Sequence, residues 1–147
     1  MKKISVKKLL VIALSMFIIY SLVWFLTITI KYDKYTKAVP KNEYGLHYTV
    51  KDGYTYNIKK PFFFSFTGNL AVTKNRAGKS LIIWPKIFGG YTYGFHIRKD
   101  ESDYQIYVDE NYNPINKDDV VTVQKVNECR TELEELFSKA NEMWQLK

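Results

Sequence analysis

The chain has a single cysteine, Cys129, among its 147 residues, so no disulfide bond can form within it. Small exported domains often rely on disulfides for stability, so a domain of this chain depends on packing alone. Twelve tyrosines, nine phenylalanines and three tryptophans supply large apolar side chains for that packing. The sequence therefore predicts a small core that is rich in aromatic residues and free of disulfides.

The sequence also lacks any charged residue between Leu9 and Ile30. A helix of this length is about 33 Å long, which is enough to cross a hydrocarbon core of about 30 Å. A cleaved signal peptide has a shorter apolar region and ends at a small-residue site, and no such site follows Ile30. We therefore predict an uncleaved transmembrane helix over residues 9–30, preceded by a short basic cytoplasmic tail over residues 1–8.

Lysines flank the apolar segment on both sides, and their distribution indicates which side faces the cytoplasm. Four lysines crowd the N-terminal edge, whereas Asp33 dilutes the four on the other flank. We therefore expect a single-pass protein of the cell membrane with a cytoplasmic N-terminus and an extracellular C-terminal domain. The lipid bilayer is the expected partner of residues 9–30 and the flanking lysines, with Tyr32 and Tyr35 in an interfacial aromatic belt.

The excess of positive charge is confined to the membrane-proximal part of the chain. Residues 1–41 hold eight lysines and one aspartate, whereas residues 42–147 hold fourteen basic and fourteen acidic residues. A nucleic-acid-binding domain needs a basic patch on its folded part. The charge balance therefore favours anionic lipid headgroups and argues against nucleic acid as a partner.

After the apolar segment, Pro40 and Gly45 punctuate residues 31–45, which predict a juxtamembrane linker. Residues 46–147 predict one extracytoplasmic domain, because alternating apolar positions and turn signals recur at short intervals. The pair Asp52-Gly53 is typical of a type I′ hairpin turn. The predicted strands cover residues 46–50, 54–58, 61–66, 70–73, 80–84, 91–97 and 103–108.

The C-terminal region changes to a helical period. One apolar stripe runs along it, formed by Val126, Cys129, Leu133, Leu136, Phe137, Ala140, Met143 and Trp144. We expect Glu132 and Glu135 on the solvent side of this helix. The predicted fold class is α+β: an N-terminal transmembrane helix, then a small antiparallel β-sheet domain with a C-terminal amphipathic helix packed on the sheet.

Motifs for catalysis, metals and cofactors are weak. The Gly78-Lys79-Ser80 triplet lacks both the earlier glycine and the following helix of a phosphate-binding loop. The turn that begins at Asp109 matches only the first ligand positions of a calcium loop. Cys129, His47 and His96 are scattered along the chain with no orienting partner suggested by their spacing. We therefore predict no catalytic residues, no metal site and no cofactor.

The segment from Trp84 to Phe95 is the best candidate for a binding patch. Its aromatic residues accompany three glycines, and such residues either stack on a ligand or fill the core. The candidate patch consists of Trp84, Phe88, Tyr91, Tyr93 and Phe95. The pair Lys59-Lys60 before three phenylalanines has two interpretations as well, a strand that enters the core or a segment that dips into the bilayer interface.

These patterns favour a non-enzymatic binding or accessory module of a bacterial cell envelope. The composition, rich in lysine, asparagine, isoleucine, tyrosine and phenylalanine, indicates an AT-rich genome. The expected partner is an envelope protein, a peptide or the wall, contacted through a sheet face or edge. Two alternatives remain: an envelope enzyme that uses His47 or His96 as a base, and a self-protection protein of the immunity type.

Overall fold

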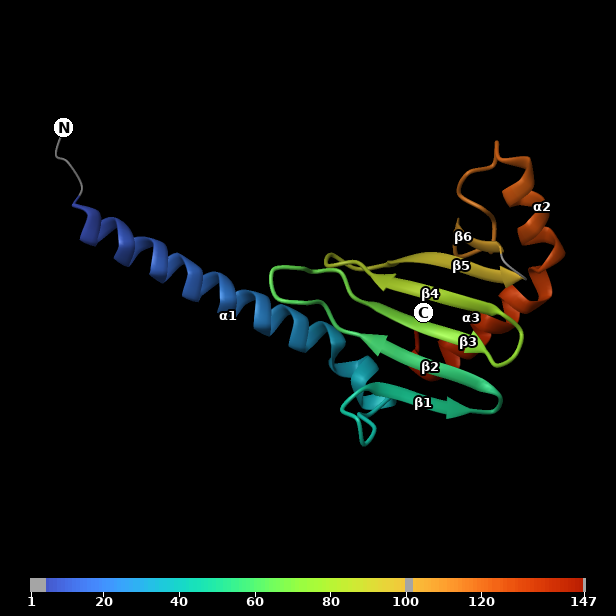
Figure 1. Ribbon diagram of the computed structural model, residues 1–147, viewed down its shortest axis with the longest axis horizontal. Helices are drawn as coiled ribbons and strands as arrows, with labels where there is room; N and C mark the ends of the chain where they lie inside the picture. Colours follow the sequence, from blue (N-terminus) through green and yellow to red (C-terminus); the bar gives the residue numbers. More distant parts are fainter. Residues whose placement is uncertain (1–4, 100–101, 147) are drawn as a thin grey trace.

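The protein consists of a long N-terminal helix, a six-stranded sheet and two C-terminal helices (Figure 1). The computed structural model describes residues 5–99 and 102–146. The elements, in order, are α1 (Val6–Ala38), β1 (His47–Lys51), β2 (Tyr54–Lys59), β3 (Asn69–Lys74), β4 (Lys79–Pro85), β5 (Tyr91–Lys99), β6 (Ser102–Val108), α2 (Val120–Glu128) and α3 (Arg130–Trp144). The predicted α+β fold class is confirmed.

The sheet is an antiparallel meander in which each strand pairs with the next, in the order β1-β2-β3-β4-β5-β6. Short connections produce this order, because consecutive antiparallel strands need only a tight turn between them. Asp52 and Gly53 adopt φ angles of 52° and 81°, and Lys51 pairs with Tyr54 across them. These positive φ values confirm the hairpin expected from the Asp-Gly pair.

One face of the sheet forms the core. Residues that alternate along the strands point to this covered face, and its fully buried members include Leu70, Val72, Leu81, Ile83 and Phe95. Helix α3 contacts β3 and β4, and it also contacts α1. Apolar residues at every second strand position thus meet the apolar stripe of α3, which is the arrangement that the two periodicities predict.

Helix α1 extends further than the sequence analysis expected. Instead of ending at a linker near residue 31, it runs to Ala38, and its final part is buried in the domain core. Ile28, Tyr32, Tyr35 and Val39 lie at helical spacing on one face, and each is at most 5% exposed. Tyr32 and Tyr35 are therefore core residues and not part of an interfacial belt, because the helical period continues until Pro40 ends it.

The apolar part of α1 projects from the domain (Figure 1). No residue of the window that makes this helix long and apolar enough to cross a membrane is buried inside the protein. The first buried residue of α1 is Ile28. One continuous helix thus serves both the exposed apolar segment and the folded domain.

The predicted strand at residues 61–66 is wrong, because this segment is a loop between β2 and β3. Its consecutive phenylalanines do not alternate between core and solvent, and Phe64 adopts a φ of 68° in a turn closed by a hydrogen bond from the Ser65 amide to the Phe62 carbonyl, 2.9 Å long. The loop returns to the sheet at Gly68. A Cβ there would lie 2.6 Å from the Tyr32 hydroxyl oxygen, so glycine permits this close approach.

The C-terminal region forms two helices in place of the single predicted one. The helical pattern breaks at Cys129, which adopts φ −109° and ψ 18°. The break redirects the chain, so that α3 packs across β3 and β4 while α2 leads into it at an angle (Figure 1). The predicted apolar stripe is confirmed at its buried members Val126, Leu133, Leu136, Phe137, Ala140 and Trp144.

The burial of Tyr32 generates a stability test of the full chain. Tyr32→Ala is expected to lower the free energy of unfolding of the domain by about 3–5 kcal/mol, because a fully buried aromatic ring leaves a cavity. Leu22→Ala, on the projecting part of α1 and 58% exposed, is expected to change it by less than about 0.5 kcal/mol. Denaturant titration in detergent micelles, followed by near-UV circular dichroism, measures both. Equal effects would show that the end of α1 is not part of the core.

Candidate functional site

The candidate site is the face of the sheet opposite the helices, called here the open face. Helix α3 lies behind the sheet in the view of Figure 1, and the covered face is the one that it contacts. The strand register places one set of alternating residues on the open face. Small polar side chains cross its width, among them Thr55, Asn57, Thr73, Ser80, Thr92 and Gln105.

An aromatic pair stands on the open face across the three strands β4, β5 and β6. The rings of Trp84 and Tyr107 have centroids 5.8 Å apart, and Tyr107 is 49% exposed. Gly94 lies between them, paired with Tyr107 in the register. A Cβ at Gly94 would lie 2.8 Å from two carbons of the Trp84 ring, so the ring rests against the Gly94 backbone. The glycine is thus required by the close approach of the indole.

A polar cluster lies on the same face toward the opposite ends of β5 and β6. The Nε2 atom of His96 contacts a carboxylate oxygen of Asp103, and the guanidinium of Arg98 lies 3.7 Å from the other oxygen. These three side chains come from adjacent strands in which Arg98 pairs with Asp103. The open face therefore combines an aromatic pair with a charged cluster, separated along the strands.

The structure does not bring the five residues of the predicted patch together. Tyr91, Tyr93 and Phe95 alternate along β5 and lie together on the covered face. Trp84 pairs with Thr92, so it lies on the open face. Phe95 is fully buried and Tyr93 packs on Phe137 with ring centroids 4.8 Å apart. Phe88 is fully exposed in the β4–β5 turn. Binding at these residues stays a prediction. The five residues lie in three different places: the open face, the covered face and the β4–β5 turn.

Sequence reasoning missed Tyr107 as the partner of Trp84. The two residues are far apart in the chain, and only the register of β4, β5 and β6 places them near each other. The available signal was the alternation in β6, where Tyr104, Ile106 and Val108 share one face. Tyr107 falls on the other face, and Gly94 marks the position of the ring that crosses β5.

The residues considered for thiol or histidine chemistry lie apart. His47 lies on the covered side at the edge strand β1, where its Nδ1 is 2.7 Å from the carbonyl oxygen of Val39. His96 lies on the open face beside Asp103, so the sheet separates it from Cys129, which precedes α3. Neither histidine therefore lies on the same face and at the same end of the sheet as the Cys129 thiol.

Asp109 serves its own turn. Its Oδ1 accepts hydrogen bonds from the amides of Asn111 and Asn113, each 2.9 Å long. Partial burial opposes ionisation of this carboxyl, but the bonds from Asn113 and Asn111 outweigh it and hold the pKa of Asp109 below its usual range. Across residues 5–99 and 102–146, no group of three or more histidine, cysteine or carboxylate side chains is arranged to hold a metal ion.

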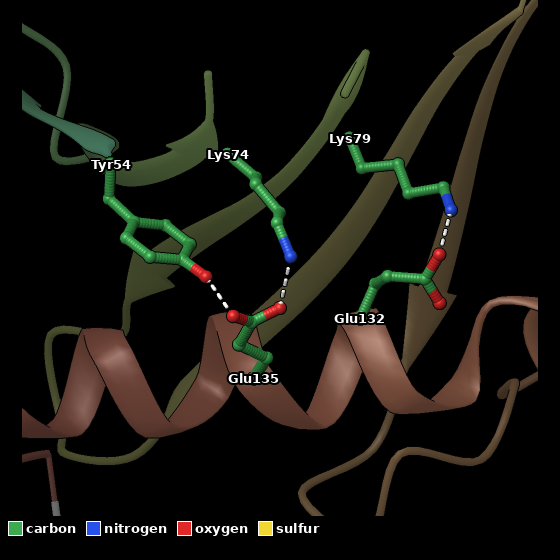
Figure 2. Close-up of polar contacts among 5 residues, drawn as sticks. All are labelled: Tyr54, Lys74, Lys79, Glu132 and Glu135. Atoms are coloured by element: carbon green, nitrogen blue, oxygen red, sulfur yellow. Dashed lines mark hydrogen bonds and ion pairs between the residues drawn. The ribbon is translucent and has the colours of Figure 1, made fainter. Parts of the chain in front are cut away.

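Charged contacts join α3 to β3 and β4 next to the turn that connects these two strands (Figure 2). Glu135 accepts hydrogen bonds from the Tyr54 hydroxyl and from Lys74, whose Nζ is 2.6 Å away, and Glu132 pairs with Lys79. The expectation that both glutamates face solvent is therefore wrong. Lys74 and Lys79 pair across the β3–β4 hairpin on the covered face, which directs both ammonium groups to the helix.

These contacts change the pKa values of the groups involved. The bond from Lys74, followed by the bond from Tyr54, lowers the pKa of Glu135. The bond from Lys79 likewise lowers the pKa of Glu132. Burial, then the bond to Glu135, raises the pKa of Tyr54 to about 12. All three shifts favour the protonation states that hold α3 on the sheet at neutral pH.

The lowered pKa of Glu135 predicts how stability depends on pH. The folded carboxylate binds fewer protons than the unfolded one, so its stabilising effect is complete above the ordinary glutamate value of 4.5 and is lost as the pH falls through the lower folded value. Glu135→Gln is expected to reduce stability at pH 7 by up to about 1 kcal/mol and to weaken the decline on acidification. Denaturant titrations between neutral and acidic pH measure this.

Glu134→Gln is the matched control for that prediction. Glu134 is exposed, and its carboxylate lies 3.2 Å from the Nε atom of Arg130. Among the described residues, this ion pair within α3 is the only one that Glu134 forms. We expect this variant to retain nearly all of the stability and acid sensitivity of the parent. An identical response of the two variants would show that the contacts of Glu135 with the sheet do not stabilise the fold.

Comparison with known proteins identifies no relative. No protein-family model matches the chain, no curated protein matches it and no solved structure matches it. Functional inference therefore rests on the chain's own residues. The features that bear on function are the projecting apolar part of α1, the open face with Trp84 and Tyr107, and the separation of the two histidines.

Proposed function

We propose that this protein is a non-enzymatic binding module of a bacterial cell envelope, anchored by α1 in the membrane with its domain on the outer side. The observation that supports the binding role is the open face, where Trp84 and Tyr107 lie together and no helix of the described part of the chain covers them. The proposed partner is an envelope protein or peptide.

Membrane anchoring is supported by the composition and the surroundings of α1. No residue of its apolar window is buried in the domain, and aliphatic residues such as Leu14 and Leu22 are 61% and 58% exposed. Water is a poor solvent for so large an apolar surface, whereas a bilayer matches both its length and its chemistry. The lysines around residues 2–8 favour a cytoplasmic N-terminus.

The composition of the open face supports recognition of a protein or peptide. Tryptophan and tyrosine are enriched at protein interfaces, because they bury a large area and retain a polar atom for hydrogen bonding. The Trp84–Tyr107 pair has this character, with Thr92 and Gln105 beside it in the register. At one edge of the sheet, β1 pairs only with β2 along most of its length in the described residues, so strand addition is a second route for an extended peptide.

The arrangement of reactive groups favours binding over catalysis. A nucleophile and its base must lie within hydrogen-bond reach of each other. His47 contacts a backbone carbonyl on the covered side, whereas His96 contacts Asp103 on the open face. Cys129 lies at the start of α3 with the sheet between it and His96. We therefore propose no catalytic role for these three residues.

Anchoring predicts how the protein fractionates. The full-length chain is expected to stay with the membrane pellet after an alkaline carbonate wash and to retain its N-terminal residues, because the exposed apolar segment of α1 matches a bilayer in length. Immunoblotting of the pellet and N-terminal sequencing measure both properties. Recovery of a shortened chain from the culture medium would contradict the proposed anchor.

The open face predicts a site of contact in cells. A photo-crosslinking amino acid at Thr92, beside Trp84 in the register, is expected to form an adduct of defined mass in the full-length, membrane-bound protein. Trp84→Ala is expected to abolish most of the yield of this adduct, because aromatic side chains contribute much of the binding energy of interfaces. Circular dichroism of the variant confirms that the fold is kept.

Ser138 provides the control position, since it is exposed on α3, which lies on the other side of the sheet. The same crosslinker there is expected to give no defined adduct. Equal adducts at both positions, or none at Thr92, would contradict binding at the open face. An adduct that disappears on digestion with lysozyme would contradict a protein partner and identify the wall instead.

A further inference from the structure

Two connections of the sheet extend in the same direction as the apolar part of α1. The β2–β3 loop covers residues 60–68 and the β4–β5 turn covers residues 86–90. The register shows that they leave the same end of the sheet, because Ile58, Leu70 and Ile83 lie side by side there. In Figure 1 both connections point toward the N-terminal part of α1.

The tips of these connections are apolar and exposed. We call them the aromatic rim, which consists of Phe62, Phe63, Phe64, Ile87 and Phe88. Their side chains are between 42% and 101% exposed, and Phe88 has the highest value. Exposed apolar residues gathered at one end of a domain mark a surface that contacts something apolar.

The β2–β3 loop is packed directly against the apolar segment of α1. Phe64 stacks on Tyr20 with ring centroids 5.4 Å apart and contacts Phe17 at 5.9 Å. Phe63 lies edge-on to Trp24 at 5.2 Å. Any bilayer that surrounds α1 at the height of residues 17–24 must therefore also meet this loop.

The polar backbone groups of the loop tip are partly satisfied by the protein itself. The indole Nε1 of Trp24 donates a hydrogen bond of 2.6 Å to the Ser65 carbonyl. The Ser65 amide donates to the Phe62 carbonyl, and the Thr67 amide donates to the Ser65 hydroxyl at 3.2 Å. Such internal bonds reduce the cost of placing a loop near lipid, where water is scarce.

The basic residues at this end suit an anionic surface. Residues 59–68 and 85–90 contain Lys59, Lys60 and Lys86 and no acidic residue. All three lysines are exposed. Lysines close to the surface of an anionic leaflet are attracted to its headgroups. The apolar tips thus suit the acyl chains, and the lysines at their base suit the lipid headgroups.

We propose that the aromatic rim is a second membrane contact, which inserts into the outer leaflet of an anionic bilayer beside α1. The proposal rests on the anchoring role of α1 proposed above. It moves the outer boundary of the hydrocarbon core from Ile30 to the neighbourhood of Trp24, because the loop tip reaches the height of Phe17.

Helix geometry supports this boundary. From Phe17 to Ile30 the axial rise is about 20 Å, which would place the loop tip beyond the middle of a core of about 30 Å. From Phe17 to Trp24 the rise is about 10 Å, a depth typical of interfacial apolar segments. The remaining span over residues 9–24 is about 24 Å long, and Lys7 and Lys8 can extend to the inner headgroups.

Spin labels test the proposal in the full-length protein, with Cys129→Ser removing the native thiol. Phe62→Cys and Phe88→Cys each carry a nitroxide in vesicles of phosphatidylcholine and phosphatidylglycerol. The label is expected to be accessible to oxygen and several-fold less accessible to a water-soluble nickel chelate than a label at Arg76→Cys. Arg76 lies in the β3–β4 turn at the opposite end of the sheet and is exposed.

A label at Leu14→Cys separates this proposal from the anchoring role. Suppose that the label at position 14 is in lipid while the labels at positions 62 and 88 are as accessible to nickel as the one at position 76. The membrane contact of the aromatic rim is then overturned, and the anchoring role of α1 stands. If the label at position 14 is itself in water, the anchor fails and the proposal fails with it.

The lysines are tested in the same vesicles. Lys60→Glu combined with Lys86→Glu is expected to raise the nickel accessibility of the label at position 88, because acidic side chains are repelled by the anionic surface. Lys51→Glu, on an exposed lysine at the β1–β2 hairpin at the far end of the sheet, is the matched control and is expected to have no effect. Equal accessibility with and without the paired substitution would overturn the role of the basic residues.

Discussion

The architecture depends on the continuity of α1. A single helix of 33 residues begins in the exposed apolar segment and ends inside the domain core, where Tyr32 is fully buried. A helix is stiff over this length, so the orientation of the sheet relative to the apolar segment is set by packing and not by a flexible tether. This rigidity places the β2–β3 loop against α1 and gives the domain one end that faces the proposed membrane.

The same packing divides the sheet into two unlike faces. The covered face is filled by α3 and the end of α1, and the contacts of Glu132 and Glu135 hold α3 at the far ends of β3 and β4. No helix of the described residues covers the open face, and its side chains are mostly polar apart from positions such as Ile82, Trp84 and Tyr107. A large aromatic pair on such a face has no role in the core, which is why binding is its proposed use.

Sequence patterns predicted the local elements well where one period held. Six of the seven predicted strands lie within two residues of observed ones, and the Asp52–Gly53 turn has the expected positive φ angles. The prediction failed at residues 61–66, because consecutive phenylalanines suit either a buried strand or an exposed loop. It failed again at residues 31–38, where Tyr32 and Tyr35 continue a buried stripe that begins at Ile28 and ends at Val39. Lysines interrupt this stripe in the sequence, so it was not recognised.

The candidate site was harder to predict than the fold. Of the predicted patch, Trp84 lies on the open face, whereas Tyr91, Tyr93 and Phe95 belong to the covered face. Alternation groups the three β5 residues on one face, but only the β4–β5 register shows that Trp84 pairs with Thr92 and so lies on the other face. Tyr107 was beyond reach, because a contact between β4 and β6 requires the register of both strands with β5.

The sequence by itself determined the properties that depend on neighbours along the chain: an apolar helix of membrane-spanning length, short antiparallel strands joined by tight turns, and an amphipathic C-terminal region. Only the tertiary structure decided which residues meet across the molecule, including Trp84 with Tyr107, Glu135 with Lys74, and Phe64 with Tyr20. The reason is that local patterns follow from the backbone period alone, whereas these contacts depend on register and on how a helix packs against distant strands.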